Sequence, residues 1–262
     1  MCMFKSGIIL KDRVFVPDYD HHTDMLEELG IEDNWTNAET KFIRVELIPP
    51  NNDMFSPIET WKFNVDQDIL PDWYVKEVDR DRMVSAVKGW AKEHIFIDKS
   101  DFTIGEGTYY LKNCKRVACH SSTVKAYDSS TVEAYDSSTV KAYDSSTVKA
   151  YDSSTVKACH SSTVKAYDSS TVKAYDSSTV EAYDSSTVEA WGSSTVEAWG
   201  SSTVEAWGSS TVEAWGSAIA FIPKGSMVKR ESIVLMENST LKDCNTKTLY
   251  QSGDWKLVII DD

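Results

Sequence analysis

Several features that would define the class of this 262-residue chain are missing from it. Its five cysteines form no CxxC pair, which argues against a disulfide scaffold or a zinc site and favours reduced thiols. No apolar run reaches the ~18 residues that a membrane-spanning helix needs. No apolar stretch precedes the first charges either, so we expect a cytoplasmic protein without a secretory signal. Walker, GxGxxG, GxSxG and kinase signatures are also absent.

Positive charge is in short supply. The chain has 27 Lys and Arg residues against 41 Asp and Glu residues, which gives a formal net charge of −14. An acidic surface repels other polyanions, so we expect neither nucleic acid nor a membrane surface to be the partner.

What is present is a repeat. Residues 121–216 are twelve unbroken octads of the form Ser-Ser-Thr-Val-(Lys/Glu)-Ala-(Tyr/Trp/Cys)-(Asp/Gly/His). Disordered segments are poor in β-branched and aromatic residues, whereas each octad carries Thr, Val and usually an aromatic residue, all of them strand formers. The repeat therefore predicts one short strand per octad, with a turn at each Asp-Ser or Gly-Ser junction.

Side chains alternate between the two faces of a strand, which divides each octad into two sets. Ser, Val and Ala at positions 2, 4 and 6 share one face, and Thr, Lys or Glu, and the aromatic at positions 3, 5 and 7 share the other. A stacked charge cannot be buried, so Ser, Val and Ala face the core. Such small residues fill only a narrow gap, which favours a parallel β-solenoid (β-helix) with two octads per coil over a triangular coil of three octads.

The rest of the chain predicts two further parts. Residues 1–112 read as a small α+β domain, with a hairpin of 7–10 and 14–16, a short helix over 24–29 capped by Thr23, strands over 42–48 and 60–65, and a long helix from Asp79. The mainly-β solenoid then covers 113–262, starting with a degenerate octad at 113–120 and ending in a more apolar cap at 217–262.

Outward aromatics are expected to stack along each edge of the rod, one ring per rung. Most of the negative charge of the octads lies in the last five, where Tyr also gives way to Trp. Contiguous aromatic area often marks a partner site. The alternative is that these rings have a purely structural role and cover the corners of the coil. The candidate binding residues are Trp191, Trp199, Trp207, Trp215, Glu181, Glu189, Glu197, Glu205 and Glu213.

A cluster of metal-type side chains offers an alternative. Asp18, Asp20, His21, His22 and Asp24 lie close together in the N-terminal region, and a metal-dependent hydrolase would start from such a group. Adjacent histidines point in different directions, however, and no second ligand group follows at a recognised spacing, which favours structural roles. His120 and His160 lie five octads apart, on opposite sides of a two-octad coil, so we do not expect them to share a metal.

Two resemblances carry further expectations. The segments Ser-Thr-Val-(Lys/Glu) and Ala-(Tyr/Trp)-(Asp/Gly) resemble the octads of bacterial ice-nucleation proteins, but Lys or Glu replaces the second outward Thr that ice binding needs. The chain is also similar to uncharacterised octapeptide-repeat proteins of phages and gut bacteria, in its repeat and in the acidic segment Trp61 to Trp73 (WKFNVDQDILPDW). This resemblance implies an origin in a phage or another mobile element.

These observations favour a non-enzymatic interaction or scaffold protein without cofactor, metal or catalytic residues. Its solenoid would present acidic and aromatic ladders for homodimer formation or for a host protein, in one form as an inhibitor that imitates the charge of a nucleic acid. The alternative is a metal-dependent hydrolase in the N-terminal domain, with the solenoid as an oligomerisation spacer.

Overall fold

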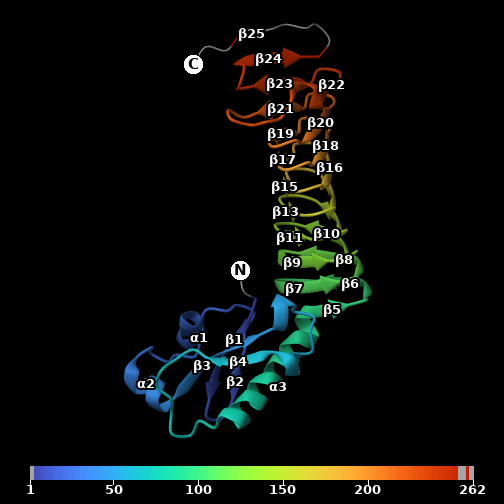
Figure 1. Cartoon of the computed structure of the whole chain (residues 1–262). Coiled ribbons are helices and arrows are strands. Elements are labelled where there is room, and N and C mark those ends of the chain that lie inside the picture. Colours follow the sequence, from blue (N-terminus) through green and yellow to red (C-terminus); the bar gives the residue numbers. More distant parts are fainter. Residues whose placement is uncertain (1–2, 253–257, 260–262) are drawn as a thin grey trace. The chain divides into compact units, whose positions relative to one another are not determined.

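The computed structural model describes residues 3–252 and 258–259, which belong to two compact units, Met1–Phe96 and Ile97–Asp262. The first unit combines helices with a small antiparallel sheet, and the second is a parallel β-solenoid of about eight turns (Figure 1). The fold class expected from the repeat is therefore confirmed.

The N-terminal unit is built on a four-stranded antiparallel sheet with the order β2-β1-β3-β4. Its elements are β1 (Lys5–Leu10), β2 (Val14–Phe15), α1 (His22–Glu28), α2 (Trp35–Thr40), β3 (Phe42–Ile48), the 3₁₀ helices η1 (Pro50–Asn52) and η2 (Ile58–Thr60), β4 (Lys62–Val65) and α3 (Lys76–His94). The predicted hairpin and the two later strands are thus confirmed.

Both faces of this sheet are covered, because every residue of β1 is buried. On one face Ile8 packs with Met25 and Leu26 of α1. On the other face lies α3, whose Met83 passes so close to Gly7 that a Cβ on this glycine would sit 2.9 Å from the Met83 Cε atom. Helix α3 therefore packs on the sheet through Met83, and Gly7 permits the close approach.

Two helix starts differ from the sequence predictions. Helix α1 begins at His22 after His21, which makes no side-chain capping bond, so Thr23 is not the cap. Helix α3 begins at Lys76, ahead of Asp79, whose carboxylate accepts a hydrogen bond from the backbone of Val75 at 2.9 Å. An acidic residue in the first turn can cap a helix by accepting a hydrogen bond from the backbone that precedes it. The helix therefore starts three residues before Asp79. Helix α2 was not predicted from the sequence.

The solenoid consists of two facing sheets that alternate along the chain. The even sheet contains β6 (Ser100–Ile104), β8 (Lys115–His120), β10 (Thr131–Tyr135), β12 (Thr147–Ala150), β14 (Thr163–Ala166), β16 (Thr179–Ala182), β18 (Thr195–Ala198), β20 (Thr211–Ala214) and β22 (Ile233–Leu235). The odd sheet contains β5 (Ile95–Ile97), β7 (Gly107–Lys112), β9 (Ser122–Tyr127), β11 (Thr139–Ala142), β13 (Thr155–Ala158), β15 (Thr171–Ala174), β17 (Thr187–Ala190), β19 (Thr203–Ala206), β21 (Ile219–Ile222), β23 (Thr240–Asp243), β24 (Thr248–Gln251) and β25 (Val258–Ile259).

Each coil of the rod contains two octads. Thr131 pairs with Thr147, and Thr139 pairs with Thr155, in parallel register. This register places each residue beside its equivalent two octads away, so identical side chains stack along the rod. The alternative of three octads per coil is thereby excluded.

The interior is made of the three small residues that the alternation predicts. Val and Ala at positions 4 and 6 are 0% exposed in all twelve octads, and the Ser at position 2 is buried with them. Several of these Ser hydroxyls donate to the carbonyl three residues earlier, as Ser130 does to Tyr127 at 2.8 Å. The core is therefore thin and continuous, and it repeats unchanged along the octads.

Corners of the coil use the left-handed backbone region. Asp128 and its equivalents have φ near +57°, as for Asp144, and the glycines of the later octads have similar values, such as +68° at Gly192. Asp tolerates this conformation better than most residues, and Gly adopts it without steric cost. The turn predicted at each octad junction is confirmed.

The solenoid begins earlier than the octads indicate. Strand β6 pairs in parallel with β8, and β7 pairs with β9, so both belong to the rod although they lie before the predicted boundary at 112/113. The division between the two compact units falls between Phe96 and Ile97. The first coils do not need the octad sequence, because larger buried side chains such as Leu111 take the place of Val and Ala in their core.

The far end of the rod is closed by a change of strand direction. Strand β21 pairs in parallel with β23, but β23, β24 and β25 follow one another antiparallel. A cap in this region was expected, and the larger buried side chains Ile222 and Leu241 replace Ala and Val there. Trp255, Lys256, Leu257 and Ile260 of the predicted cap lie outside the described residues.

Candidate interaction surfaces

Aromatic side chains line both edges of the rod, where the chain passes from one sheet to the other. The even edge, which follows the even strands, carries Tyr135, Tyr151, Tyr167, Tyr183, Trp199 and Trp215. The odd edge, which follows the odd strands, carries Tyr127, Tyr143, Cys159, Tyr175, Trp191 and Trp207. The rings of Tyr151 and Tyr167 are stacked with centroids 5.0 Å apart, and the same spacing holds to their neighbours. The expected ladders are present.

The four tryptophans form two separate pairs. Trp191 stacks on Trp207 at 4.8 Å on the odd edge, and Trp199 stacks on Trp215 at 4.8 Å on the even edge. They are half-buried, and the indole nitrogens of Trp191, Trp199 and Trp215 lie buried without a hydrogen-bond partner within the described part of the chain. The rings therefore cover the corners of the coil, and each edge of the rod presents one stacked pair of indole rings.

The odd edge is interrupted at one rung, where Cys159 stands in place of a ring. Here the ring of His160 tilts toward Tyr143 at a centroid distance of 6.5 Å, and the ammonium group of Lys157 lies 4.9 Å from the centre of the Tyr175 ring. Side chains from the same rung thus fill the gap. His120 lies on the other edge, stacked on Tyr135, so the two histidines are separated as predicted.

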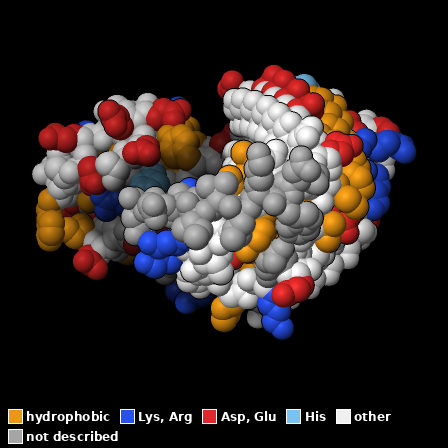
Figure 2. All heavy atoms as spheres, turned by 90° about the horizontal axis from the view of Figure 1, so that it is seen from above, with side chains coloured by type: hydrophobic (Ala, Val, Ile, Leu, Met, Phe, Trp, Pro, Cys, Tyr) orange, Lys and Arg blue, Asp and Glu red, His pale blue; other side chains and the backbone are white. Residues whose placement is uncertain are grey.

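Charged side chains at position 5 form one column on each face, beside a column of Thr. On the odd face the column runs Lys125, Lys141, Lys157, Lys173, Glu189, Glu205 and Phe221. On the even face it runs Glu133, Lys149, Lys165, Glu181, Glu197, Glu213 and Val234. Figure 2, which views the protein from above, shows a row of acidic side chains beside hydrophobic ones on the rod, with basic and acidic side chains mixed beyond them.

The even face neutralises both of its lysines. The Lys149 ammonium lies 3.0 Å from the Glu133 carboxylate, and that of Lys165 lies 2.8 Å from Glu181. These hydrogen bonds lower the pKa of both carboxyl groups, and the hydrogen bond to Glu181 raises the pKa of the Tyr183 hydroxyl to about 12. Glu181 is therefore part of an internal network.

The odd face is less balanced. Its one ion pair between octads joins Lys173 to Glu189 at 3.0 Å within the described residues. Lys141 and Lys157 form no ion pair with any carboxylate of the described chain, and they stack in parallel register with each other. Two of the predicted binding residues, Glu181 and Glu189, are thus engaged by lysines, whereas Glu197, Glu205 and Glu213 form no ion pair in this part of the structure.

The corners carry a second kind of acidic ladder. The carboxylate of Asp152 accepts a hydrogen bond from the backbone N–H of Asp136 at 3.0 Å, and that of Asp168 accepts one from Asp152 at 3.2 Å. Each of these Asp residues therefore satisfies the corner of the preceding rung. In the last four octads Gly replaces Asp, and this ladder ends.

In the N-terminal unit the five metal-type side chains do not converge. Asp20 pairs with the buried Lys5 at 2.8 Å, His22 contacts Asp66 at 3.2 Å, and Asp18 contacts His94 at 3.0 Å. Burial lowers the pKa of Lys5 although Asp20 opposes this shift. Among the described residues no group of three or more His, Cys, Asp or Glu side chains is arranged to hold a metal.

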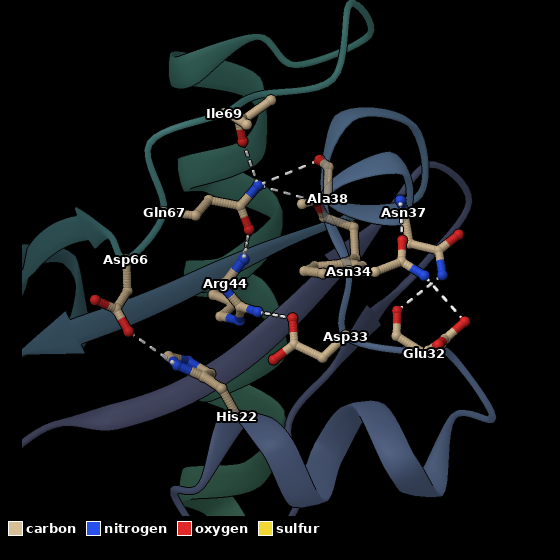
Figure 3. Close-up of polar contacts among 11 residues, drawn as sticks. His22, Glu32, Asp33, Asn34, Asn37, Ala38, Arg44, Asp66, Gln67 and Ile69 are labelled. Atoms are coloured by element: carbon tan, nitrogen blue, oxygen red, sulfur yellow. Dashed lines mark hydrogen bonds and ion pairs between the residues drawn. The ribbon is translucent and has the colours of Figure 1, made fainter.

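His22 belongs to a polar network that fixes loops onto the sheet (Figure 3). The Gln67 side chain accepts a hydrogen bond from the Arg44 backbone at 2.8 Å and donates to the carbonyl of Ile69 at 2.5 Å. Asn34 caps α2 by accepting from the Asn37 backbone at 2.9 Å. These polar side chains have structural roles, because each hydrogen bond holds a loop or a helix end against a neighbouring element.

A hollow of about 390 Å³ lies on the same unit. Its lining combines the apolar side chains of Met54, Ile58 and Ile95 with Lys88 and Lys92 of α3. Lys88 is already engaged by Glu59. The hollow is open to solvent, and the Ser56 hydroxyl in its lining donates a hydrogen bond to the carbonyl of Asp53 and accepts one from the indole of Trp61.

The arrangement as a whole defines a β-solenoid with patterned outer surfaces. Comparison with protein-family models, curated proteins and solved structures finds no match to this chain. The structure also contains, within its described residues, no helix with the length and apolar character to cross a membrane.

The division of the charges between the two faces was not predicted, because successive octads belong alternately to the two sheets. Reading every second octad would have separated a column with four consecutive lysines on the odd face from a column with three consecutive glutamates on the even face.

Proposed function

We propose that this chain is a non-enzymatic interaction or scaffold protein of phage or mobile-element origin, which acts through the outer surface of its rod. Its partners would be a second copy of the chain or a host protein. The observation that carries this proposal is the parallel register, which repeats the same outward side chains once per coil on a two-sheet support. Repetition turns individually weak contacts into one long complementary surface.

The candidate surface is the segment with β17 to β20. Here the column residues are Glu189, Glu205, Glu197 and Glu213, and each edge carries a stacked pair of tryptophans. Flat, rigid aromatic side chains lose little conformational entropy on binding, and a row of carboxylates attracts a basic partner and steers its approach.

Imitation of nucleic acid charge receives less support. The longest carboxylate column is that of Glu181, Glu197 and Glu213 on the even face, and Lys165 neutralises the first of these. Glu189 and Glu205 lie on the odd face, so neither face offers the long row that such imitation needs. The hydrolase alternative also has no observation in its favour, because Asp18, Asp20 and His22 are each engaged by a different side chain of the N-terminal unit.

The test is affinity capture with the full chain and two matched variants. One variant neutralises three late carboxylates (Glu197→Gln, Glu205→Gln, Glu213→Gln), and the control neutralises three carboxylates at the corners of the earlier octads (Asp136→Asn, Asp152→Asn, Asp168→Asn). The amount of protein captured by the wild type should fall at least about tenfold when the late variant is used instead. Equal capture by that variant would contradict the proposed surface. A wild type that binds no protein and stays monomeric up to about 1 mM would contradict the function itself.

A further inference from the structure

The odd face has a charge order that complements itself when reversed. Its column reads four lysines, two glutamates and one phenylalanine, from Lys125 to Phe221. Opposite signs therefore occupy opposite ends of one flat surface. A surface with this order can pair with a second copy turned end to end, because closed twofold dimers use the same patch on both subunits.

We propose that two copies of this chain associate antiparallel, odd face against odd face, around a twofold axis that runs along β15 (Thr171–Ala174). This inference rests on the proposed function and names its partner as a second copy. An axis in this direction keeps each column opposite the same column of the other copy, so Thr faces Thr and charge faces charge.

The register follows from the charges. With the axis at β15, Lys157 lies opposite Glu189 of the other copy and Lys141 lies opposite Glu205, and each of these pairs occurs twice. Lys125 lies opposite Phe221. The one like pair is Lys173 with its own copy on the axis, and each Lys173 already has Glu189 within 3.0 Å in its own chain.

Neighbouring registers are worse. A shift of the axis by half a rung in one direction sets Lys157 against Lys173 twice. In the other direction it keeps two kinds of Lys–Glu pair, but it sets Lys141 against Phe221 and Lys125 against Lys242 of β23, a like pair that occurs twice. Like charges directly opposite each other at close range destabilise an interface. The charge order thus selects one register.

The even face is a poorer candidate for the same arrangement. Its two lysines are already neutralised by Glu133 and Glu181, at 3.0 and 2.8 Å. On the odd face Lys141 and Lys157 have no such partner within the described residues, so a second copy would supply carboxylates that the chain itself does not.

Apolar side chains extend the odd face beyond the charges. Ile219 takes the place of an outward Thr and is 43% exposed, and Phe221 takes the place of a Glu in the same strand. Seven rungs at ~4.8 Å and a strand width of ~15 Å bury roughly 1,000 Å² in total over both copies. This is the low end for specific interfaces, so the dimer should be weak and sensitive to salt.

The experiment reverses charges on the full-length protein and follows association by sedimentation. Lys141→Glu with Lys157→Glu makes the odd face acidic, and Glu189→Lys with Glu205→Lys makes it basic. Each variant alone should dimerise at least about tenfold more weakly than the wild type, and an equimolar mixture should recover dimers at least as tight as the wild type. Thermal unfolding of each variant checks that the fold is intact.

The matched control applies the same charge change as Lys141→Glu with Lys157→Glu to the other face, as Lys149→Glu with Lys165→Glu. It should leave the dimer unchanged. The inference is overturned if the wild type stays monomeric from about 10 µM to 1 mM at low ionic strength, or if the mixture fails to associate. Loss of association in the even-face control would overturn it as well, because it would show contact between unlike faces. The proposed function would survive these results if a host protein still binds the late octads.

Discussion

The early coils, with β9 to β16, and the late coils, with β17 to β20, share one backbone and one core but differ in where they carry charge. In the early coils the carboxylates of Asp lie at the corners and lysines predominate on the faces. In the late coils glycines occupy the corners and glutamates occupy the faces. The comparison shows that this solenoid can exchange its whole outer surface without changing its interior.

The replacement of Asp by Gly at the corners also changes how the corners are stabilised. Asp at a corner accepts a backbone hydrogen bond from the preceding rung, as Asp152 does from Asp136, whereas Gly offers no side chain. Gly instead lets successive corners approach closely, and every Gly corner accompanies a Trp at the preceding position. The same corner conformation is thus supported by an Asp carboxylate in the early coils and by the absence of a side chain in the late coils.

The largest effect should come from the shared core. Val148→Ala in an early coil and Val196→Ala in a late coil should each lower the free energy of unfolding by about 2 kcal/mol, because both side chains are 0% exposed and their loss leaves a cavity. Chemical denaturation measures both values. A difference well above about 0.5 kcal/mol between the two variants would contradict the view that the core is identical in both regions.

The corners should respond differently in the two regions. Gly208 has φ +66°, and a Cβ there would lie 2.9 Å from the Gly192 carbonyl oxygen, so Gly208→Ala should cost about 1 to 2 kcal/mol. Asp152→Gly loses one hydrogen bond but relaxes a residue with φ +56°, so its net effect should stay within about 0.5 kcal/mol. Thermal and denaturant unfolding distinguish them, and Ser209→Ala controls for a neighbouring exposed site. Equal costs at Gly208 and Asp152 would refute the distinction.

A smaller effect should appear at high pH. The hydrogen bond to Glu181 raises the pKa of Tyr183 to about 12, above the ~10 of an unfolded tyrosine. Its stabilising contribution is therefore present below pH ~10 and is lost as the pH rises through about 12. Tyr183→Phe should reduce the loss of stability across this window, as followed by denaturation at each pH. Glu181→Gln should shift the ultraviolet titration of one tyrosine toward lower pH, and an unchanged titration would contradict the assignment.

The smallest effects should differ in sign. Glu189→Gln breaks an exposed ion pair with Lys173 and should cost at most about 0.5 kcal/mol. Glu213→Gln removes a charge that stacks in register with Glu197 and should be neutral or slightly stabilising. Both differences should vanish in about 1 M salt. Stabilisation by Glu189→Gln at low salt would show that the ion pair contributes nothing.

Much of the rod could be predicted from the residues. Alternation within the octad placed Val and Ala inside and Lys or Glu outside, and the small size of the core residues favoured a coil of two octads. The start of the rod could not be predicted, because β6 and β7 keep the alternation without the octad residues, and solenoid coils before the repeat have no fixed sequence signal.

The surfaces were predicted less completely, for a geometrical reason. Charges at neighbouring octads lie on opposite faces, so Lys173 and Glu181 are close in sequence but belong to different columns. Glu181 and Glu189 looked like members of one acidic end, yet each is held by a lysine one coil earlier. Such pairs become visible only when the charges are followed along every second octad, which is the spacing of residues in one column.

The most direct measurement of the central claim, that a face of the rod is the working surface, is cross-linking at single outward positions of the full chain. Thr171→Cys lies on the odd face at the proposed axis, and Thr179→Cys lies on the even face one octad later. Treated with a short bismaleimide, beside wild type as the background for native cysteines, Thr171→Cys should form a covalent dimer and Thr179→Cys should not. Cross-linking at Thr179 alone, or at neither position, would contradict the account.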